Sequence, residues 1–280
     1  MSLLLVRLAR RPLALLGIAL VILHLGTALI APWVIPFDPE RLLDAPLEAP
    51  NGIYGLGTDV LGRDFLSRVV MGGRTAVLVA FVAGLLAALG GGVVGLIAAY
   101  CRGFVDDAIS RVIDMKLAIP AILFVSLFVT GFGQSLLVLI VVITLIQMIG
   151  VIRTARSQGI TLMEQGFVKA AILRGETGAV ILVRELLPNI ADLLSVEFAL
   201  RSSSALLLVS ALSFLGLGIS PPTPDWGLMI QEGLGSMQSE PWLIFVPALC
   251  ISTLVVGINF ATEGLADALG LEDARGTAGH

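Results

Sequence analysis

Apolar stretches long enough to cross a lipid bilayer recur along this chain, and they constrain its fold more than any other feature. A helix needs about 20 apolar residues to cross the hydrocarbon core. Stretches of this kind lie at about 13–35, 75–100, 117–132, 135–152, 190–217 and 242–264. Hydrophobic residues make up 57% of the 280 residues and charged residues only 14%, a balance foreign to soluble domains. The sequence therefore predicts an all-α membrane protein with six transmembrane helices.

The third and fourth predicted spans are separated by only Gly133 and Gln134. One continuous helix over both stretches would be too long for a single bilayer, so we expect a tight hairpin at this point. Ten-residue segments of alternating hydrophobicity, which are typical of outer-membrane barrels, do not occur in the sequence.

Basic residues set the expected orientation, because cytoplasmic loops of membrane proteins carry an excess of Lys and Arg. With a cytoplasmic N-terminus, the inside segments are 1–12, 101–116, 153–189 and 265–280. These hold twelve basic residues, whereas the outside segments hold four. The sequence therefore predicts a multi-pass protein with both termini in the cytoplasm.

The segment 153–189 is the longest polar stretch expected in the cytoplasm. A short helix is predicted from side chains at helical spacing, namely Phe167, Ala170, Ala171 and Arg174. Gly175 stops or bends this helix, and a second helical stretch leads to Pro188, where the fifth span begins. Small side chains permit close approach by another surface, which favours docking to a cytoplasmic protein. An ordinary loop between spans is the alternative.

Three separated stretches of the sequence resemble one family of membrane proteins. Phe167-Val168-Lys169-Ala170-Ala171, followed by Gly175, Ile181, Arg184 and Leu187-Pro188-Asn189, resembles the EAA loop of ABC-importer permeases. Residues 55–68 resemble the segment before the second span of dipeptide/oligopeptide/nickel-type permeases. Residues 212–227 resemble the exit of the fifth span and the outside loop of the same group. The stretches occur in order, and the resemblance covers nearly the whole chain. Together with the short N-terminal cytoplasmic stretch, they make the chain similar to the C-type permease subunit of this group.

The resemblance implies the type I ABC importer transmembrane fold and a location in the bacterial cytoplasmic (inner) membrane. It implies a permease subunit of an ATP-driven importer for a small solute, with di- and oligopeptides favoured and nickel or a metal chelate as the alternative. Such a chain is not an enzyme and binds no cofactor or metal, since ATP and Mg are bound by partner ATPase subunits. The implied partners are a second homologous permease, two ATPase subunits (or one heterodimer), a periplasmic or lipid-anchored solute-binding protein and membrane lipid, with no nucleic acid.

The resemblance also assigns a role to the segment 153–189, which in the family carries the coupling helix that fits a cleft of the ATPase. The coupling residues expected on this basis are Phe167, Lys169, Ala170, Ala171, Gly175 and Pro188. Lys169 departs from the family, which usually has Glu there. Contact with the ATPase and simple solvation both stay open for this side chain.

The expected domain organisation follows from the same resemblance. Residues 1–74 form an N-terminal unit, with the span at about 13–35 followed by a periplasmic segment. Residues 75–267 form the permease domain with its coupling loop at 153–189, and residues 268–280 form a cytoplasmic tail.

Charged and polar residues within the predicted spans are candidates for the translocation path. Glu197 and Arg201 in the fifth span are four residues apart, so a helix places them on one face in the favoured order of acid before base. A lone Arg near the bilayer centre costs on the order of 3 kcal/mol, which disfavours lipid exposure. We hypothesise that Glu197, Arg201, Ser204 and Asn259 line the path. A buried pair that only fixes helix packing is the alternative for Glu197 and Arg201.

The outside segments contain residues with less specific expectations. Trp226 and Trp242 suit the aromatic belt at the membrane interface. Glu232 is expected to be a solvated charge, with contact to a solute-binding protein as the alternative.

Motifs of other functional classes do not occur in the sequence. A phosphate-binding Gly-x-x-x-x-Gly-Lys-Ser/Thr loop is missing, which excludes ATP hydrolysis by this chain. His-Glu-x-x-His and Gly-x-Ser-x-Gly are also missing, which disfavours a membrane hydrolase. A stand-alone secondary transporter would usually show internal repeats and more spans. A passive membrane scaffold is a third class, and it leaves the docking segment unexplained.

Overall fold

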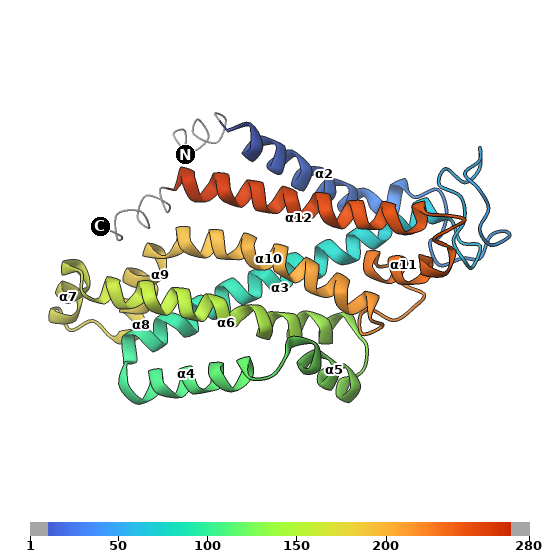
Figure 1. The fold of residues 1–280 in the computed structure, drawn as a ribbon. Coiled ribbons are helices and arrows are strands. Elements are labelled where there is room, and N and C mark those ends of the chain that lie inside the picture. The colour runs from blue at the N-terminus through green and yellow to red at the C-terminus, as the bar shows by residue number, and fades with distance from the viewer. Residues whose placement is uncertain (1–10, 270–280) are drawn as a thin grey trace.

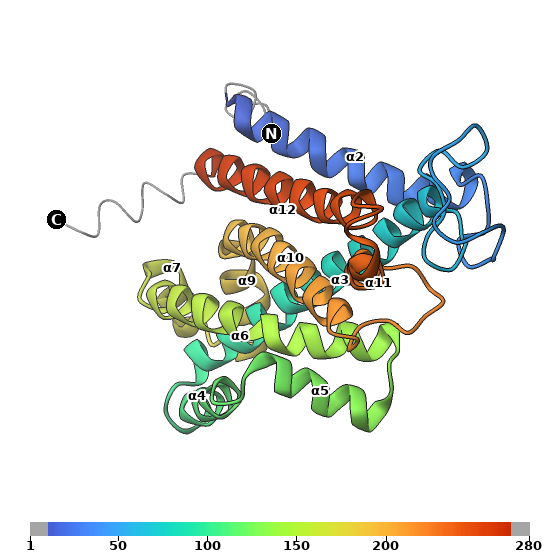
Figure 2. The same ribbon diagram turned by 45° about the vertical axis from the view of Figure 1, so that its right-hand side comes forward.

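The computed structural model describes residues 11–269, and these form a bundle of long helices that lie side by side (Figures 1 and 2). The longer helices are α2 (Pro12–Val34), α3 (Phe65–Cys101), α4 (Gly103–Leu117), α5 (Ala121–Phe132), α6 (Leu136–Met163), α7 (Gly166–Leu173), α10 (Ala191–Phe214), α11 (Trp226–Gly233) and α12 (Trp242–Ala268). Short turns are α8 (Gly178–Val180), the π-helical η1 (Ile181–Leu186), α9 (Leu187–Asn189) and η2 (Leu234–Ser236). Within the described range the only β-pairing is an isolated bridge between Thr58 and Asp64.

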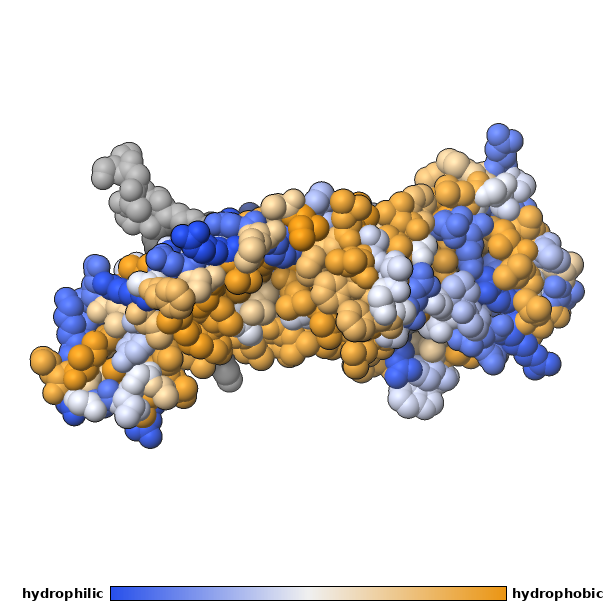
Figure 3. Space-filling view, turned by 90° about the horizontal axis from the view of Figure 1, so that it is seen from below, coloured by the Kyte–Doolittle hydropathy of each residue, from blue (hydrophilic) through white to orange (hydrophobic). Residues whose placement is uncertain are grey.

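Five of the described helices are long and apolar enough to cross a bilayer, and the bent pair α4 and α5 gives a sixth span if it counts as one. This agrees with the predicted all-α fold of six spans. A space-filling view shows a hydrophobic band across the middle of one face, with hydrophilic residues gathered toward its two ends (Figure 3). That distribution suits a protein embedded in lipid.

The third span differs most from its prediction at about 117–132. Helix α4 already occupies most of the predicted loop 101–116, and the chain then turns by 89° before α5. The break falls at Pro120, which lacks an N–H group and disfavours helical backbone in the residue before it. Helix α5 has 12 residues and measures only about 18 Å, so it needs α4 to complete a crossing.

Two other helices extend beyond the predicted spans. Helix α3 begins at Phe65, ten residues before the predicted start, because the Asp64 carboxylate accepts the N–H of Ser67 and caps the helix. The predicted domain boundary at residue 75 therefore falls inside α3. Helix α6 continues past residue 152 to Met163. The predicted tail 268–280 lies outside the described residues from residue 270 onward.

The bundle is held together by close packing around α3, which contacts α2, α6 and α10. A Cβ on Gly91 would stand 2.7 Å from Val151 Cβ of α6, and one on Gly95 would stand 2.6 Å from the Ile152 carbonyl oxygen. Only glycine permits this approach, which is the packing expected of small residues between membrane helices.

The two ends of the bundle differ in structure. One end carries α7, α8 and α9 together with the start of α2 and the finish of α12; we call it the α7 end (Figure 1). The opposite end carries α11 and the long segment 35–64; we call it the α11 end. The first and last described helices thus reach the same end as α7, as an even number of crossings requires.

Candidate functional sites

The first candidate site is the segment 164–190 at the α7 end, which we call the elbow. Its helix α7 stops after Leu173, and Gly175 follows with φ +77°, a backbone conformation that favours glycine. The predicted short helix and its glycine stop are therefore present. The chain then turns back through η1 and α9 and enters α10.

A hydrophobic cluster fixes the elbow to three long helices. From the elbow it includes Val168, Ala171, Ile181, Leu186 and Ile190, and from α3, α6 and α10 it includes Leu96, Val151, Ala155 and Leu194. Val168 and Ala171 are completely buried. A push on the elbow is therefore transmitted to the ends of α3, α6 and α10, because tightly packed side chains leave little room for independent movement.

The opposite face of α7 is uncovered and apolar. Leu173 is 88% exposed, and Ile172 and Phe167 are each exposed by 40% or more. Large exposed apolar side chains gathered at one place mark a surface for a partner. The elbow thus has one face packed on the spans and one face free for contact.

The residues predicted for coupling divide between these two faces. Phe167, Lys169, Ala170, Gly175 and Pro188 are exposed. Ala171 points into the hydrophobic cluster, so its side chain supports the seat of the elbow and is not available to a partner as the elbow stands. Sequence reasoning missed Leu173 and Ile172, although their apolar character beside Ala171 was a usable signal.

The second candidate site is the predicted charge pair within α10. Arg201 Nε donates to Glu197 Oε2 at 2.9 Å, and Glu197 is buried. The guanidinium lies against Gly150 of α6, where a Cβ would stand 2.9 Å from Nη1. The pair therefore sits at the contact between α10 and α6. Ser204 and Asn259 are both exposed.

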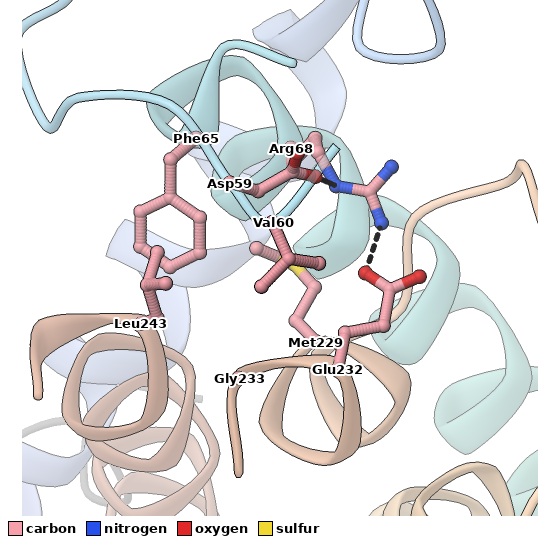
Figure 4. Close-up of a pocket in the computed structure, with 8 residues that line it drawn as sticks. All are labelled: Asp59, Val60, Phe65, Arg68, Met229, Glu232, Gly233 and Leu243. Carbon is pink, nitrogen blue, oxygen red and sulfur yellow. Dashed lines mark hydrogen bonds and ion pairs between the residues drawn. The ribbon is translucent and has the colours of Figure 1, made fainter. Parts of the chain in front are cut away.

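The third site lies at the α11 end, where four charged residues meet; Figure 4 shows three of them, Asp59, Arg68 and Glu232. Asp59 Oδ2 accepts from Arg63 Nε at 2.6 Å and lies 3.1 Å from Arg68 Nε. Glu232 Oε2 accepts from Arg63 Nη2 at 3.0 Å and from Arg68 Nη2 at 2.9 Å. Arg68 is completely buried, and Glu232 is 17% exposed. Two cations and two carboxylates thus balance in a setting with little water.

This charge network joins segments that are far apart in the sequence. Asp59 and Arg63 belong to the segment before α3, Arg68 to the first turn of α3, and Glu232 to α11. Gly62 is needed to form the loop, since it adopts φ +76° and a Cβ there would stand 2.1 Å from the Asp44 carbonyl oxygen. The network therefore fastens the segment before α3 to α11. It also corrects the expectation that Glu232 is a solvated charge.

The tryptophan expectation is also wrong for Trp226. Its side chain is 3% exposed and packs on Gly73 of α3, while its Nε1 donates to the Val69 carbonyl oxygen at 2.8 Å. Trp242 is partly buried and donates to the Leu56 carbonyl oxygen at 3.2 Å. Both indoles anchor the α11 end of the protein, because a buried N–H group requires an acceptor.

Asp225, which precedes Trp226, caps the N-terminus of α11 and is almost completely buried. Burial raises the pKa of this carboxyl group, against the opposing effects of the Ser213 hydroxyl and of hydrogen bonds from the N–H groups of Leu228 and Gly227.

These features define a class of protein, a helical membrane protein with several spans. At one end an exposed surface for a partner is packed on the spans, and at the other end a network of ion pairs holds α11 to the start of α3. Residues 91–270 match a family model described as "Binding-protein-dependent transport system inner membrane component". Residues 2–50 match the "N-terminal TM domain of oligopeptide transport permease C". The chain therefore belongs to the family of binding-protein-dependent transport system inner membrane components, the permease subunits of ABC importers.

Curated relatives are similar over most of the chain. The "Oligopeptide transport system permease protein OppC" of Haemophilus influenzae is 33% identical over 247 residues, which cover 87% of this chain and 79% of that protein. The "Di/tripeptide transport system permease protein DppC" of Pseudomonas aeruginosa is 34% identical over 263 residues, covering 91% and 87%. The "Glutathione transport system permease protein GsiD" of Pectobacterium atrosepticum is 31% identical over 265 residues, covering 94% and 88%. The predicted family is confirmed: the chain is a transport subunit of the inner membrane and not an enzyme.

Proposed function

We propose that this permease imports di- and oligopeptides as one half of a membrane channel, with a second homologous permease as the other half. Two ATPase subunits, or one heterodimer, bind ATP and Mg at the α7 end, and a periplasmic or lipid-anchored binding protein delivers solute at the α11 end. Peptides are favoured because the names of the relatives above refer to oligopeptides, di- and tripeptides and glutathione. Nickel or a metal chelate is the competing cargo.

The proposed orientation places the α7 end and both termini in the cytoplasm. It rests on the excess of basic residues in the segments at that end. Residues 1–74 then form the N-terminal unit with its periplasmic segment, 75–267 the permease domain and 268–280 a cytoplasmic tail. In this proposal the boundary at residue 75 falls within α3.

The observation that carries the proposal is the two-faced elbow. Its exposed apolar face, centred on Leu173, would dock in the cleft of an ATPase subunit, and its buried face is packed on α3, α6 and α10. Closure of the ATPases around ATP would move the elbow, and the packed helices would follow as rigid bodies. The chain itself performs no covalent step. The predicted path residues Glu197, Arg201, Ser204 and Asn259 stay a proposal within this scheme.

The direct test is import by the whole complex in proteoliposomes with the binding protein outside. We expect ATP-dependent accumulation of a labelled tripeptide, and none without ATP or without the ATPase subunits. Accumulation by the permease alone would instead identify a secondary transporter. Accumulation of a nickel chelate but not of peptides would refute the proposed cargo.

The elbow is tested by Leu173→Asp, which places a charge on the exposed apolar face. We expect the variant to fold normally, since Leu173 is 88% exposed, but to lose co-purification with the ATPase. Ile53→Asp is a matched control, because Ile53 is 69% exposed at the opposite end of the bundle. Equal ATPase recovery from both variants would argue against docking at the elbow.

A further inference from the structure

One arginine at the α11 end is not part of the charge network. Arg74 lies on the third turn of α3 and is exposed. Within residues 11–269 no carboxylate lies within ion-pair distance of its guanidinium, whereas Arg63 and Arg68 each have two. Arg74 therefore keeps its positive charge available to a group from outside the described chain.

Arg74 lines a groove of about 510 Å³ that lies between α3, the turn before α6 and the loop after α10. Five of its nine lining residues are polar, namely Arg74, Thr75, Gln134, Ser220 and Thr223. A surface that faces lipid would be lined mainly by apolar side chains. Polar side chains from three separate segments therefore meet at this groove.

The far wall of the groove is held in place by hydrogen bonds. Gln134 Nε2 donates to the Gly216 carbonyl oxygen at 2.7 Å, and Ser220 Oγ donates to Gln134 Oε1 at 2.7 Å. These two bonds tie the turn before α6 to the loop after α10. Since the amide of Gln134 is occupied, the free donors of the groove are on the α3 side, chiefly the N–H groups of Arg74.

The chemistry of the free donors selects a class of ligand. A guanidinium offers a planar fork of N–H groups that matches a carboxylate and binds it in bidentate fashion. The same positive charge repels a bare metal cation. Arg74 is about 14 Å along α3 from its first residue, close to where the helix enters the apolar layer. In the proposed orientation the groove lies toward the periplasmic end of the bundle, where the binding protein would dock.

We propose that the Arg74 groove is a receiving subsite for the free carboxylate of the transported peptide. The inference rests on the proposed import of peptides and adds the chemical group by which the permease recognises them. Peptides with a free C-terminal carboxylate would be passed into the channel through this contact, and peptides without it would be passed less efficiently.

The test compares import of trialanine with import of trialanine amide by the whole complex. Each peptide is supplied at a saturating concentration of loaded binding protein. Arg74→Gln should lower the import rate of the free acid by at least about tenfold, the worth of a charge-assisted hydrogen bond, and should change the rate of the amide less than about twofold. Arg74→Lys should recover part of the loss. Arg41→Gln, which removes an exposed arginine outside the groove, should change neither rate.

Equal losses for both peptides, or no loss for either, would overturn the inference. A failure of the wild-type complex to import either peptide would refute the proposed function as a whole.

A second measurement does not depend on import. In a background with Cys101→Ser and Cys250→Ser, Thr75→Cys is labelled by anionic and cationic methanethiosulfonates, with and without Arg74→Gln.

Arg74 should raise the ratio of anionic to cationic labelling rates several-fold. Trialanine at millimolar concentration should slow the labelling, and its amide should not. A ratio that is the same in both backgrounds would overturn the inference even if peptides are imported.

Discussion

The charge network at the α11 end makes a quantitative prediction for Glu232→Gln. The substitution keeps the size and shape of the side chain but removes one of two negative charges. Oxygen Oε2 of Glu232 now accepts from Arg63 at 3.0 Å and from Arg68 at 2.9 Å. In the variant both guanidinium groups depend on the single carboxylate of Asp59, and one positive charge is left buried without compensation.

The expected loss of stability follows from the burial of the partners. Breaking a buried ion pair from one side typically costs about 3–5 kcal/mol. Glu232 is 17% exposed, and the amide oxygen of Gln still accepts one hydrogen bond, so we expect a loss at or just below the lower end of that range, about 2–3 kcal/mol. For a chain of this length that corresponds to a fall of about 5 °C in the unfolding midpoint.

Intrinsic fluorescence during heating of the purified complex in nanodiscs measures this change. Trp226 is a suitable probe because it is buried between α11 and α3, beside the network. Glu263→Gln serves as the control, since Glu263 is exposed near the end of α12. We expect the control to unfold within about 1 °C of wild type, as exposed charges contribute little.

A double-mutant cycle separates the ion pair from other effects of the substitution. Arg68→Met alone leaves two carboxylates to share Arg63, and the combination with Glu232→Gln removes one charge of each sign. The double variant should therefore lose less stability than the sum of the single losses, by about 1 kcal/mol or more. Strict additivity, or a wild-type midpoint for Glu232→Gln, would refute the reasoning.

Three further predictions concern the spans and the α11 end. Arg201→Leu should reduce peptide import, and the reduction should persist in the combination with Glu197→Gln, where no buried charge is left unpaired; wild-type import by the double variant would reduce the pair to a packing role. Gly95→Leu should prevent recovery of folded complex, because even its Cβ would stand 2.6 Å from a carbonyl oxygen of α6; detergent gel filtration would report this, and a normal elution profile would contradict it. Asp225→Asn keeps the cap of α11 but removes a carboxyl group whose pKa is raised by burial. At pH values between the ordinary pKa and the raised pKa, the folded wild-type protein binds more protons than the unfolded protein. The stability of wild type relative to Asp225→Asn should therefore fall as pH rises through that window, measured as the difference in midpoint; a difference that grows with pH would show the opposite shift.

Much of the fold was predictable because lipid imposes strong rules on the sequence. For five spans, the long apolar runs predicted at least one end of the helix to within a few residues. They could do so because an isolated segment can cross a bilayer only as a helix. The break between α4 and α5 was harder to predict, because the apolar run continues on both sides of it. Pro120 was the available signal, and it gives the position of the break but not its angle.

The elbow shows what the helical spacing of residues can and cannot predict. Helical spacing correctly predicted α7 and its stop at Gly175, but it could not tell which face is covered. Ala171 turned out to be buried and Leu173 exposed, because the elbow folds back on the ends of α3, α6 and α10. Sequence alone predicts that the small residues form the contact surface, whereas Ala171 serves the internal packing.

The charge network could not be predicted from the sequence, because Glu232 meets Arg63 across 169 positions of chain. No local pattern links the two residues. The available signal was the density of charge and glycine in residues 55–68, which is unusual for a solvated loop beside a span. Such a pattern indicates a built structure, although it does not name the distant partner.

Helix α3 connects the two ends of the molecule and suggests how a signal would travel between them. Arg68 on its first turn belongs to the charge network, and Leu96 near its last turn belongs to the cluster beneath the elbow. Its 37 residues contain no proline and form one continuous helix of about 55 Å, in contrast to the broken pair α4 and α5. A shift of the elbow would therefore reach the α11 cap by tilting α3 as a whole, because packed helices move as rigid bodies more readily than they bend. Since the charge network joins α11 to the start of α3, we expect α11 and the Arg74 groove to move with this tilt.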